Sequence, residues 1–196
     1  MIKEKHMTAS SGWPVLLTAV PLLPLAAVGF IAGIARGSIL LGVLSFLAIP
    51  ALVMTLVGLF IVNPNQGRVV LLFGRYVGTV KQPGLRWANP FLTKRKISLR
   101  VRNFETGHSK VNDTDGNPIE IASVVVWKVV DTAEASFEVD DYVNYVHVQS
   151  ESAVRNLATQ YPYDTHEDGQ LSLRGSTDKI AEKLQTEIQS RLHKAG

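Results

Sequence analysis

The pattern of hydrophobic positions divides the chain into an apolar first third and a mixed remainder. Residues 13–35 read WPVLLTAVPLLPLAAVGFIAGIA and residues 39–62 read ILLGVLSFLAIPALVMTLVGLFIV, with no ionisable side chain in either run. At ~1.5 Å per helical residue each run is roughly 35 Å long, enough to cross a hydrocarbon core of about 30 Å. The pattern therefore predicts two transmembrane helices, together residues 13–62, after a tail over residues 1–12.

Two alternatives exist for the apolar runs. A cleaved signal peptide would account for the basic start MIKEKHMTASSG and the small residues of AGIARG, but its apolar region is usually about 7 to 15 residues long, and this run is longer. Buried helices of a soluble core would need more surrounding protein than the rest of the chain supplies. We favour membrane helices.

The connection between the two runs sets the topology. Only Arg36, Gly37 and Ser38 separate them, which predicts a tight antiparallel hairpin. Lys and Arg near the ends of membrane helices are retained in the cytoplasm. The tail carries Lys3 and Lys5, and a strongly basic segment follows the second run, whereas the loop has Arg36 alone. Both termini and the soluble domain are therefore expected in the cytoplasm, in a multi-pass membrane protein.

Three glycines in or just after the first run lie four residues apart, at Gly29, Gly33 and Gly37. Such a ridge of small residues lets another helix approach closely. The partner is either the second helix of the hairpin or a helix of another subunit. Polar side chains are scarce in both runs, which argues against an ion or proton pathway.

The soluble part shows strand patterns followed by helix patterns. Residues 96–102 alternate polar and apolar, which predicts a half-buried strand, and residues 119–130 are apolar on both faces, which predicts a central strand of a covered sheet. Asp115-Gly116 predicts a tight hairpin turn. Asp140 is the expected N-cap of a helix. The apolar positions of that helix are Val143, Val146, Ala153, Val154 and Leu157.

The last segment of the chain predicts an amphipathic helix. Its apolar stripe recurs every four residues, and the pair Glu187 and Arg191 has a favourable i,i+4 spacing on its flank. The stripe can be covered by its own domain or by a neighbouring subunit. The stripe consists of Ile180, Leu184, Ile188 and Leu192.

Charge is distributed unevenly along the soluble part. Residues 68–102 contain no acid, whereas all of the 17 acidic residues except Glu4 lie beyond them. Cations interleaved with aromatic residues can bind nucleic acid, or can be a solvated face beside a core. Next to a membrane anchor, anionic lipid is the favoured partner, because each cation near such a surface contributes ~1 kcal/mol. The predicted membrane-surface residues are Arg68, Arg75, Lys81, Arg86, Trp87, Lys94, Arg95 and Lys96.

Candidate chemistry is sparse. The chain has no cysteine, its five histidines lie far apart, and it has no P-loop, dinucleotide-binding or nucleophile-elbow motif. Asp113, Asp115 and Asn117 resemble the start of a calcium loop, but that loop needs glycine at its sixth position and glutamate at its twelfth, where this chain has Pro118 and Val124. We expect no catalytic residues, no metal site, no cofactor and no nucleic-acid partner.

The order of these features resembles the stomatin/prohibitin/flotillin superfamily, also called SPFH or band 7 proteins. The resemblance rests on VNPNQG at 62–67, GLRWANPF at 84–91, DGNPI leading into VVVWKVVD at 115–131, FEV at 137–139, the helix at 148–157 and the segment LRGSTDKIAEKLQTEIQSRL. It covers residues 62–196. Each element is weak by itself, but the ordered set is specific.

The resemblance implies an α+β fold with a curved, mostly antiparallel sheet and packed helices. It divides the domain into residues 63–165 and a second part over 166–196, whose helix would lead to a coiled coil that this sequence does not contain. It also implies a scaffold that associates into large homo-oligomeric rings or cages and modulates membrane microdomains, proteases or channels. By this resemblance we expect the stripe of Ile180, Leu184, Ile188 and Leu192 to be covered by a neighbouring subunit and to serve oligomerisation. A regulatory subunit of one membrane enzyme or channel is the alternative, and a membrane-tethered enzyme ranks third.

Overall fold

The computed structural model describes residues 3–164, 170–193 and 196. The chain forms two compact units, one over Glu4–Ser98 and the other mostly over Leu99–Gly196. The first unit contains both apolar helices, which differs from the expected division into a hairpin and a separate soluble domain. The expected boundary between residues 165 and 166 lies outside the described residues.

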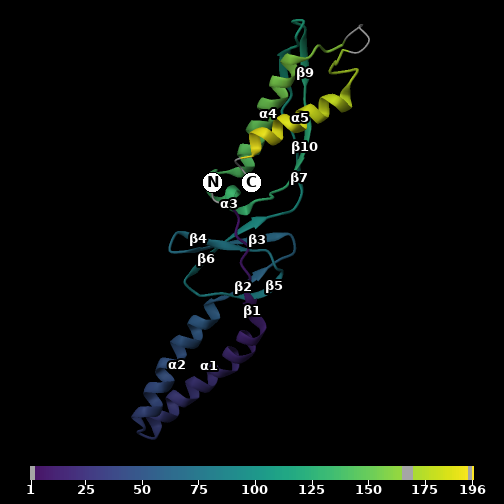
Figure 1. Ribbon diagram of the computed structural model, residues 1–196. Helices are drawn as coiled ribbons and strands as arrows, with labels where there is room; N and C mark the ends of the chain where they lie inside the picture. Colours follow the sequence, from purple (N-terminus) through teal and green to yellow (C-terminus); the bar gives the residue numbers. More distant parts are fainter. Residues whose placement is uncertain (1–2, 165–169, 194–195) are drawn as a thin grey trace. The chain divides into compact units, whose positions relative to one another are not determined.

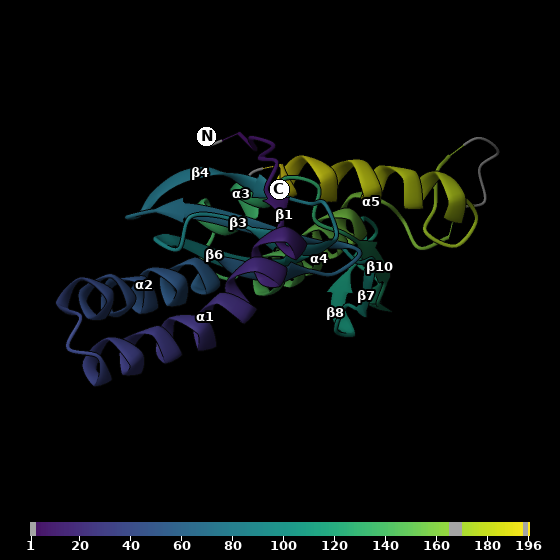
Figure 2. The ribbon, with the colours of Figure 1, turned by 90° about the horizontal axis from the view of Figure 1, so that it is seen from below.

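Two long helices form the hairpin of the first unit. Helix α1 (Gly12–Ala35) and helix α2 (Ile39–Val57) lie side by side and antiparallel (Figures 1 and 2). Both are long and apolar enough to cross a membrane. Gly37 makes the connection, because its φ of 66° lies in the left-handed region that a side chain disfavours.

The second apolar run is shorter as a helix than the sequence predicts. Helix α2 ends at Val57, Gly58 caps it, and strand β2 (Leu59–Val62) follows. A run of apolar residues has no periodicity that separates helix from buried strand, so only the pairing of β2 with strand β5 (Gly84–Trp87) decides its conformation. The 19 residues of α2 still span roughly 28 Å.

Two antiparallel sheets complete the first unit, and the expected tail is part of them. Strand β5 lies between β1 (Ser10–Ser11) and β2. The strand that precedes the hairpin and the strand that follows it therefore both pair with β5. The other sheet has the order β4-β3-β6 and its core side chains are Val70 and Val80, which pack against Ala9 and Val62. The strands of this sheet are β3 (Gln66–Leu72), β4 (Arg75–Val80) and β6 (Leu92–Ser98).

Residues 4–11 are therefore not a free tail. The amide of Met7 donates to the carbonyl of Thr79, and the amide of Thr79 donates to the carbonyl of Lys5. These bonds add the N-terminal segment to the edge of β4, which no local pattern in the segment indicated.

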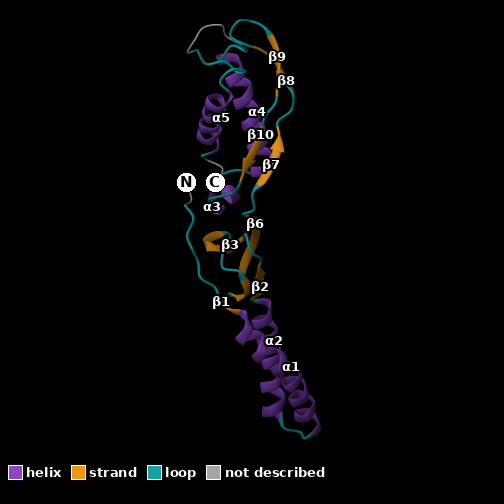
Figure 3. Cartoon of the chain, turned by 90° about the vertical axis from the view of Figure 1, so that its right-hand side faces the viewer, coloured by secondary structure: helices purple, strands orange, loops and turns teal. Residues whose placement is uncertain are grey.

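The second unit combines two antiparallel strand pairs with three helices (Figure 3). Helices α4 and α5 lie beside β7 and β10, where Ala153 and Ile188 meet Val125. The pairs are β7 (Arg102–Glu105) with β10 (Val124–Trp127) and β8 (Ser109–Asn112) with β9 (Pro118–Ile121). The helices are α3 (Thr132–Phe137), α4 (Tyr142–Gln160) and α5 (Thr177–Leu192).

The α+β class with antiparallel strands is confirmed, but three local predictions are wrong. The strand expected over residues 96–102 is divided, because β6 ends at Ser98 and β7 begins at Arg102, at the boundary between the units. The strand expected over 119–130 is two strands, and Val124 and Val126 are exposed because helices cover only the other face of β10. The N-cap of α4 is Asp141, not Asp140.

Candidate functional site: the junction between the hairpin and the sheets

The hairpin is joined to its sheets by direct contacts at the end of α2. The indole nitrogen of Trp87 donates to the carbonyl of Thr55 at 2.8 Å, and the amide of Ala88 donates to the carbonyl of Gly58 at 3.1 Å. The last four carbonyls of a helix lack the regular partner one turn further on. The carbonyl of Thr55 also accepts from the amide of Gly58 at 3.3 Å, so Trp87 adds a second bond to it. Gly58 has no room for a side chain, because a Cβ would lie 2.5 Å from Trp87 and Ala88. The sheets are thus held close to the last turn of α2.

Several of the predicted membrane-surface cations have their donors occupied inside the protein. Arg68 donates through Nε and Nη2 to the carbonyl of Ile61, at 3.2 and 2.9 Å. Lys81 lies 2.6 Å from a carboxylate oxygen of Glu4. Arg86 donates to the carbonyls of Pro83 and Ala9, which ties β5 to the N-terminal segment.

The cations of β6 lie on two faces of the sheet. Lys94 and Lys96 point to the face that carries Arg68, since Lys96 is the register partner of Arg68, whereas Arg95 points to the opposite face. The Lys94 ammonium lies 5.4 Å from the ring centre of Phe60, and partial burial lowers the pKa of Lys94.

The eight predicted residues therefore do not form one continuous face. Arg75, Arg95 and Lys96 have exposed side chains, whereas Trp87 and the remaining cations are partly buried. Binding of lipid by any of the eight stays a prediction. The sequence argument also missed Phe73, whose side chain is 85% exposed in the turn between β3 and β4. The signal was a phenylalanine beside a glycine between two strand patterns, where a polar residue is usual.

The three glycines of the ridge have two different roles, helix packing and chain turning. A Cβ at Gly33 would lie 2.6 Å from the backbone nitrogen of Gly42, and one at Gly29 would lie 2.7 Å from the hydroxyl of Ser45. Both glycines thus face α2, the first of the two alternatives left open by the sequence. Gly37 has open space around it and serves the turn. A contact between subunits is not needed to explain these positions.

The apolar stripe of α5 is covered by its own unit. Ile180 and Ile188 are buried, and Leu184 and Leu192 pack partly buried against the cluster that contains Val125 and Ala153. The flanking pair is present as well, with Arg191 Nη2 lying 2.7 Å from Glu187 Oε1. The stripe therefore has cover without a neighbouring subunit, and its part in oligomerisation stays a prediction.

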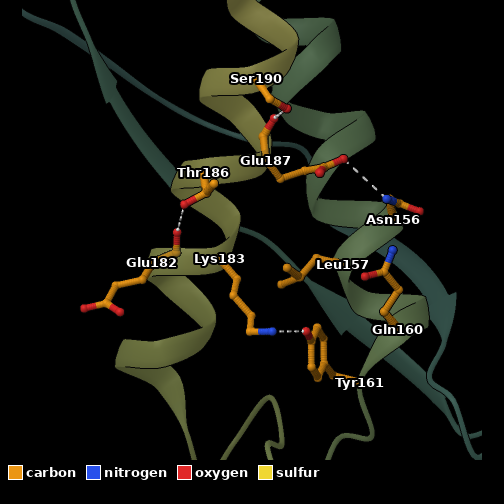
Figure 4. A pocket seen from close by; sticks show the side chains of 9 residues that line it. All are labelled: Asn156, Leu157, Gln160, Tyr161, Glu182, Lys183, Thr186, Glu187 and Ser190. Atoms are coloured by element: carbon orange, nitrogen blue, oxygen red, sulfur yellow. Dashed lines mark hydrogen bonds between the residues drawn. The ribbon is translucent and has the colours of Figure 1, made fainter.

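A polar cavity of about 440 Å³ lies between α4 and α5 (Figure 4). The side chains that line it bind one another across the two helices. Lys183 Nζ donates to the hydroxyl of Tyr161 at 2.7 Å, and Asn156 donates to Glu187 at 3.4 Å. This arrangement holds the helices together, and it shows neither a nucleophile paired with a base nor a cluster of metal ligands. Among the described residues, no group of three His, Cys, Asp or Glu side chains could hold a metal ion.

The hairpin turn predicted at Asp115-Gly116 is confirmed, and Asp113 organises it. The amide of Tyr163 donates to Asp113 Oδ2 at 3.0 Å, and the amides of Asp115 and Asn117 donate to Oδ1 at 3.0 and 2.7 Å. The bond from Tyr163 is the main reason that the pKa of Asp113 lies below its usual value; burial opposes this shift, and the bonds from Asn117 and Asp115 add to it. The carboxylate ties the β8–β9 turn to the segment after α4.

The protein combines an apolar helical hairpin with small antiparallel sheets that are bonded directly to it. These features define a membrane-associated α+β protein. The described part of the chain shows no recognisable catalytic arrangement, because the polar side chains considered above are engaged in structural contacts. The family model for the SPFH domain / Band 7 family matches residues 60–196. The chain belongs to this family.

Similar proteins come from archaea. The "Uncharacterized protein MJ0827" of Methanocaldococcus jannaschii is 31% identical over 113 residues, which cover 57% of this chain and 52% of that protein. The "Stomatin homolog PH1511" of Pyrococcus horikoshii is 29% identical over 126 residues, 64% of this chain and 44% of that protein. The chain spans about half the length of the curated relatives it matches. The stomatin-like family and the two apolar helices indicate a membrane-associated scaffold.

Proposed function

We propose that this protein is a membrane-anchored scaffold that assembles with copies of itself and organises neighbouring lipids or membrane proteins. The observation that carries the proposal is the bonded junction between α2 and the sheets. Because Trp87 and Ala88 donate to the last turn and cap of α2, the sheets stay near the bilayer wherever the hairpin is inserted. A domain held in this way presents the same surfaces to every neighbour in the membrane plane.

The proposal includes no catalytic activity, no cofactor and no nucleic acid. Polar pairs such as Lys183 with Tyr161 stabilise helix contacts, and the partners we propose are anionic lipids, further copies of the chain, and a membrane protease or channel. Lipid attraction rests on Arg75, Arg95 and Lys96, whose side chains are exposed. Salt should weaken this attraction, since the Debye length is about 8 Å at physiological ionic strength.

Both termini and the sheets are proposed to face the cytoplasm. The cation bias supports this orientation, because Lys3, Lys5 and the basic segment lie on one side of the hairpin and Arg36 alone lies on the other. A cysteine at exposed Ser38 should react with an impermeant thiol reagent applied to intact cells, and one at exposed Thr114 should react only after the cells are opened. The native chain has no cysteine that would add background. The reverse labelling pattern would contradict the orientation.

Native mass measurement of the protein in mild detergent tests the assembly. A scaffold should give a complex of many copies with one dominant size. A complex of one or two copies would contradict self-assembly and would fit a regulatory subunit instead.

A further inference from the structure

Two exposed phenylalanine side chains contact each other at one end of the β4-β3-β6 sheet. Phe73 is 85% exposed and Phe91 is 57% exposed, and their ring centres lie 6.4 Å apart. Two large aromatic rings that are exposed to water forgo the favourable free energy of burial. An exposed apolar pair of this kind is typical of a surface that another molecule covers.

The backbone of Phe73 shows that the fold itself does not require phenylalanine there. Phe73 and Gly74 are the two central residues of the β3–β4 turn, with φ angles of 47° and 85°. Two-residue turns with both φ angles positive favour Asn-Gly, because a bulky side chain is strained in the left-handed region. A residue that is unfavourable for the turn and exposed to solvent contributes to something other than folding.

The loop that carries Phe91 starts at Ala88, which is bonded to the end of α2. The amide of Ala88 donates to the carbonyl of Gly58, the cap of that helix, and Phe91 follows three residues later. Three residues reach at most about 11 Å when fully extended. A bond from the Phe91 amide to the Asn89 side chain folds the loop, which shortens that reach.

The reach of the loop from Ala88 to Phe91 can be compared with the thickness of the headgroup layer of a bilayer. The headgroup layer is roughly 5 to 7 Å deep on each side of the hydrocarbon core. With roughly 28 Å of length, α2 ends near the boundary of that core when it spans. Phe91, and Phe73 in contact with it, thus lie at the depth of the headgroups or just above them.

The charges around the pair suit a lipid surface. Arg75 follows the turn with an exposed side chain, and residues 68–102 contain no acid. Aromatic rings flanked by cations are typical of segments that insert into the interface of an anionic bilayer. A second copy of the chain is the other possible cover, but the nearness of α2 favours lipid.

We propose that Phe73 and Phe91 form an anchor that inserts into the headgroup layer of the bilayer and fixes the distance of the sheets from the membrane. The inference rests on the proposed membrane function, because it needs α2 to span. It adds two lipid-contacting residues that are distinct from the cations.

Photo-crosslinking of the full chain tests the proposal. Benzoylphenylalanine, an aromatic photo-crosslinker, replaces Phe73 or Phe91 in protein reconstituted into vesicles of zwitterionic and anionic phospholipid. Val57, exposed at the end of α2, is the lipid-facing control, and Thr114, exposed in the β8–β9 turn, is the water-facing control. Intact mass after illumination separates lipid adducts from crosslinked protein dimers.

We expect lipid adducts at positions 73 and 91 in yields near that of position 57 and at least tenfold above that of position 114. Lipid adducts at 57 without any at 73 and 91 would overturn the aromatic anchor while leaving the membrane hairpin intact. Crosslinked dimers at 73 would overturn it in favour of a second copy. Absence of lipid adducts at all four positions would overturn both this inference and the proposed function.

A second variant shows whether the two rings act together. Phe73→Asn removes one ring and gives the turn its favoured Asn-Gly sequence, so the fold is retained. With the crosslinker at position 91, this variant should lower the lipid-adduct yield about tenfold, which corresponds to about 1.4 kcal/mol. An unchanged yield would contradict joint insertion.

Discussion

The position of Ile188 gives the sharpest test of whether the α5 stripe belongs to the core of its unit or to an interface between subunits. Ile188 is only 9% exposed and packs against Val125 and Ala153. The change Ile188→Ala removes three carbon groups, which costs about 2.4 kcal/mol at ~0.8 kcal/mol each. The cavity left behind raises the cost to about 3 kcal/mol. Better helix propensity of alanine returns about 0.4 kcal/mol, so packing dominates.

Hydrogen exchange measures this loss without requiring the whole chain to unfold. A decrease of about 2.6 kcal/mol in the free energy of local opening should speed exchange of amides in α4 and α5 roughly 80-fold. Gln189→Ala is the matched control, because Gln189 is exposed on the same helix and its replacement should change stability by less than about 0.5 kcal/mol.

The result that would refute the reasoning is specific. If Ile188→Ala left exchange in α4 and α5 unchanged but reduced the native mass of the complex, the stripe would face a neighbouring subunit. The contacts of Ile188 with Val125 and Ala153 would then be replaced by contacts with the neighbouring subunit in the assembled protein.

Three further outcomes follow from particular contacts. Phe73→Asn should raise the free energy of unfolding in detergent by about 1 kcal/mol, seen as a higher Tm, since asparagine tolerates the positive φ of this turn; a lower Tm would contradict the strain. Asp113→Asn should speed exchange of the β8–β9 turn at pH 7, because the new amide meets donors from Tyr163 and Asn117. Because the pKa of Asp113 is lowered in the folded protein, the native carboxylate stabilises the turn above about pH 4. This stabilisation is lost as the pH falls through the folded pKa. Hydrogen exchange of the turn, corrected for its intrinsic pH dependence, should therefore rise in acid in the native chain but not in the variant. Gly33→Ala should destabilise the hairpin by about 1 to 3 kcal/mol in a detergent unfolding assay, because the new Cβ would meet the backbone of Gly42. Gly42→Ala is the control and should leave the stability unchanged, because a Cβ there would have open space. Equal losses of stability in the two variants would contradict the close approach of the helices.

The sequence by itself determined those features that depend on local chemistry or on composition over a long window. Two runs without charge, separated by Gly37, indicate an apolar hairpin because no soluble core of this size could cover them. Asp115-Gly116 indicates a turn because glycine takes the positive φ that it requires. The spacing of Ile180 and Ile188 indicates an amphipathic helix because that period keeps them on one face.

Only the tertiary structure decided which partner each surface meets. The apolar residues 59–62 form a strand because β5 pairs with them, and residues 4–11 join the sheets through backbone bonds that carry no sequence signature. The predicted basic segment divides into engaged and exposed cations because tertiary contacts bring the carbonyl of Ile61 to Arg68 and the carboxylate of Glu4 to Lys81. Arg95 and Lys96 are exposed on opposite faces of the sheet. The exposed contact of Phe73 with Phe91 joins two loops that are distant in the chain. Pairing and contact over such separations depend on the free energy of the whole packed unit, which local patterns do not contain.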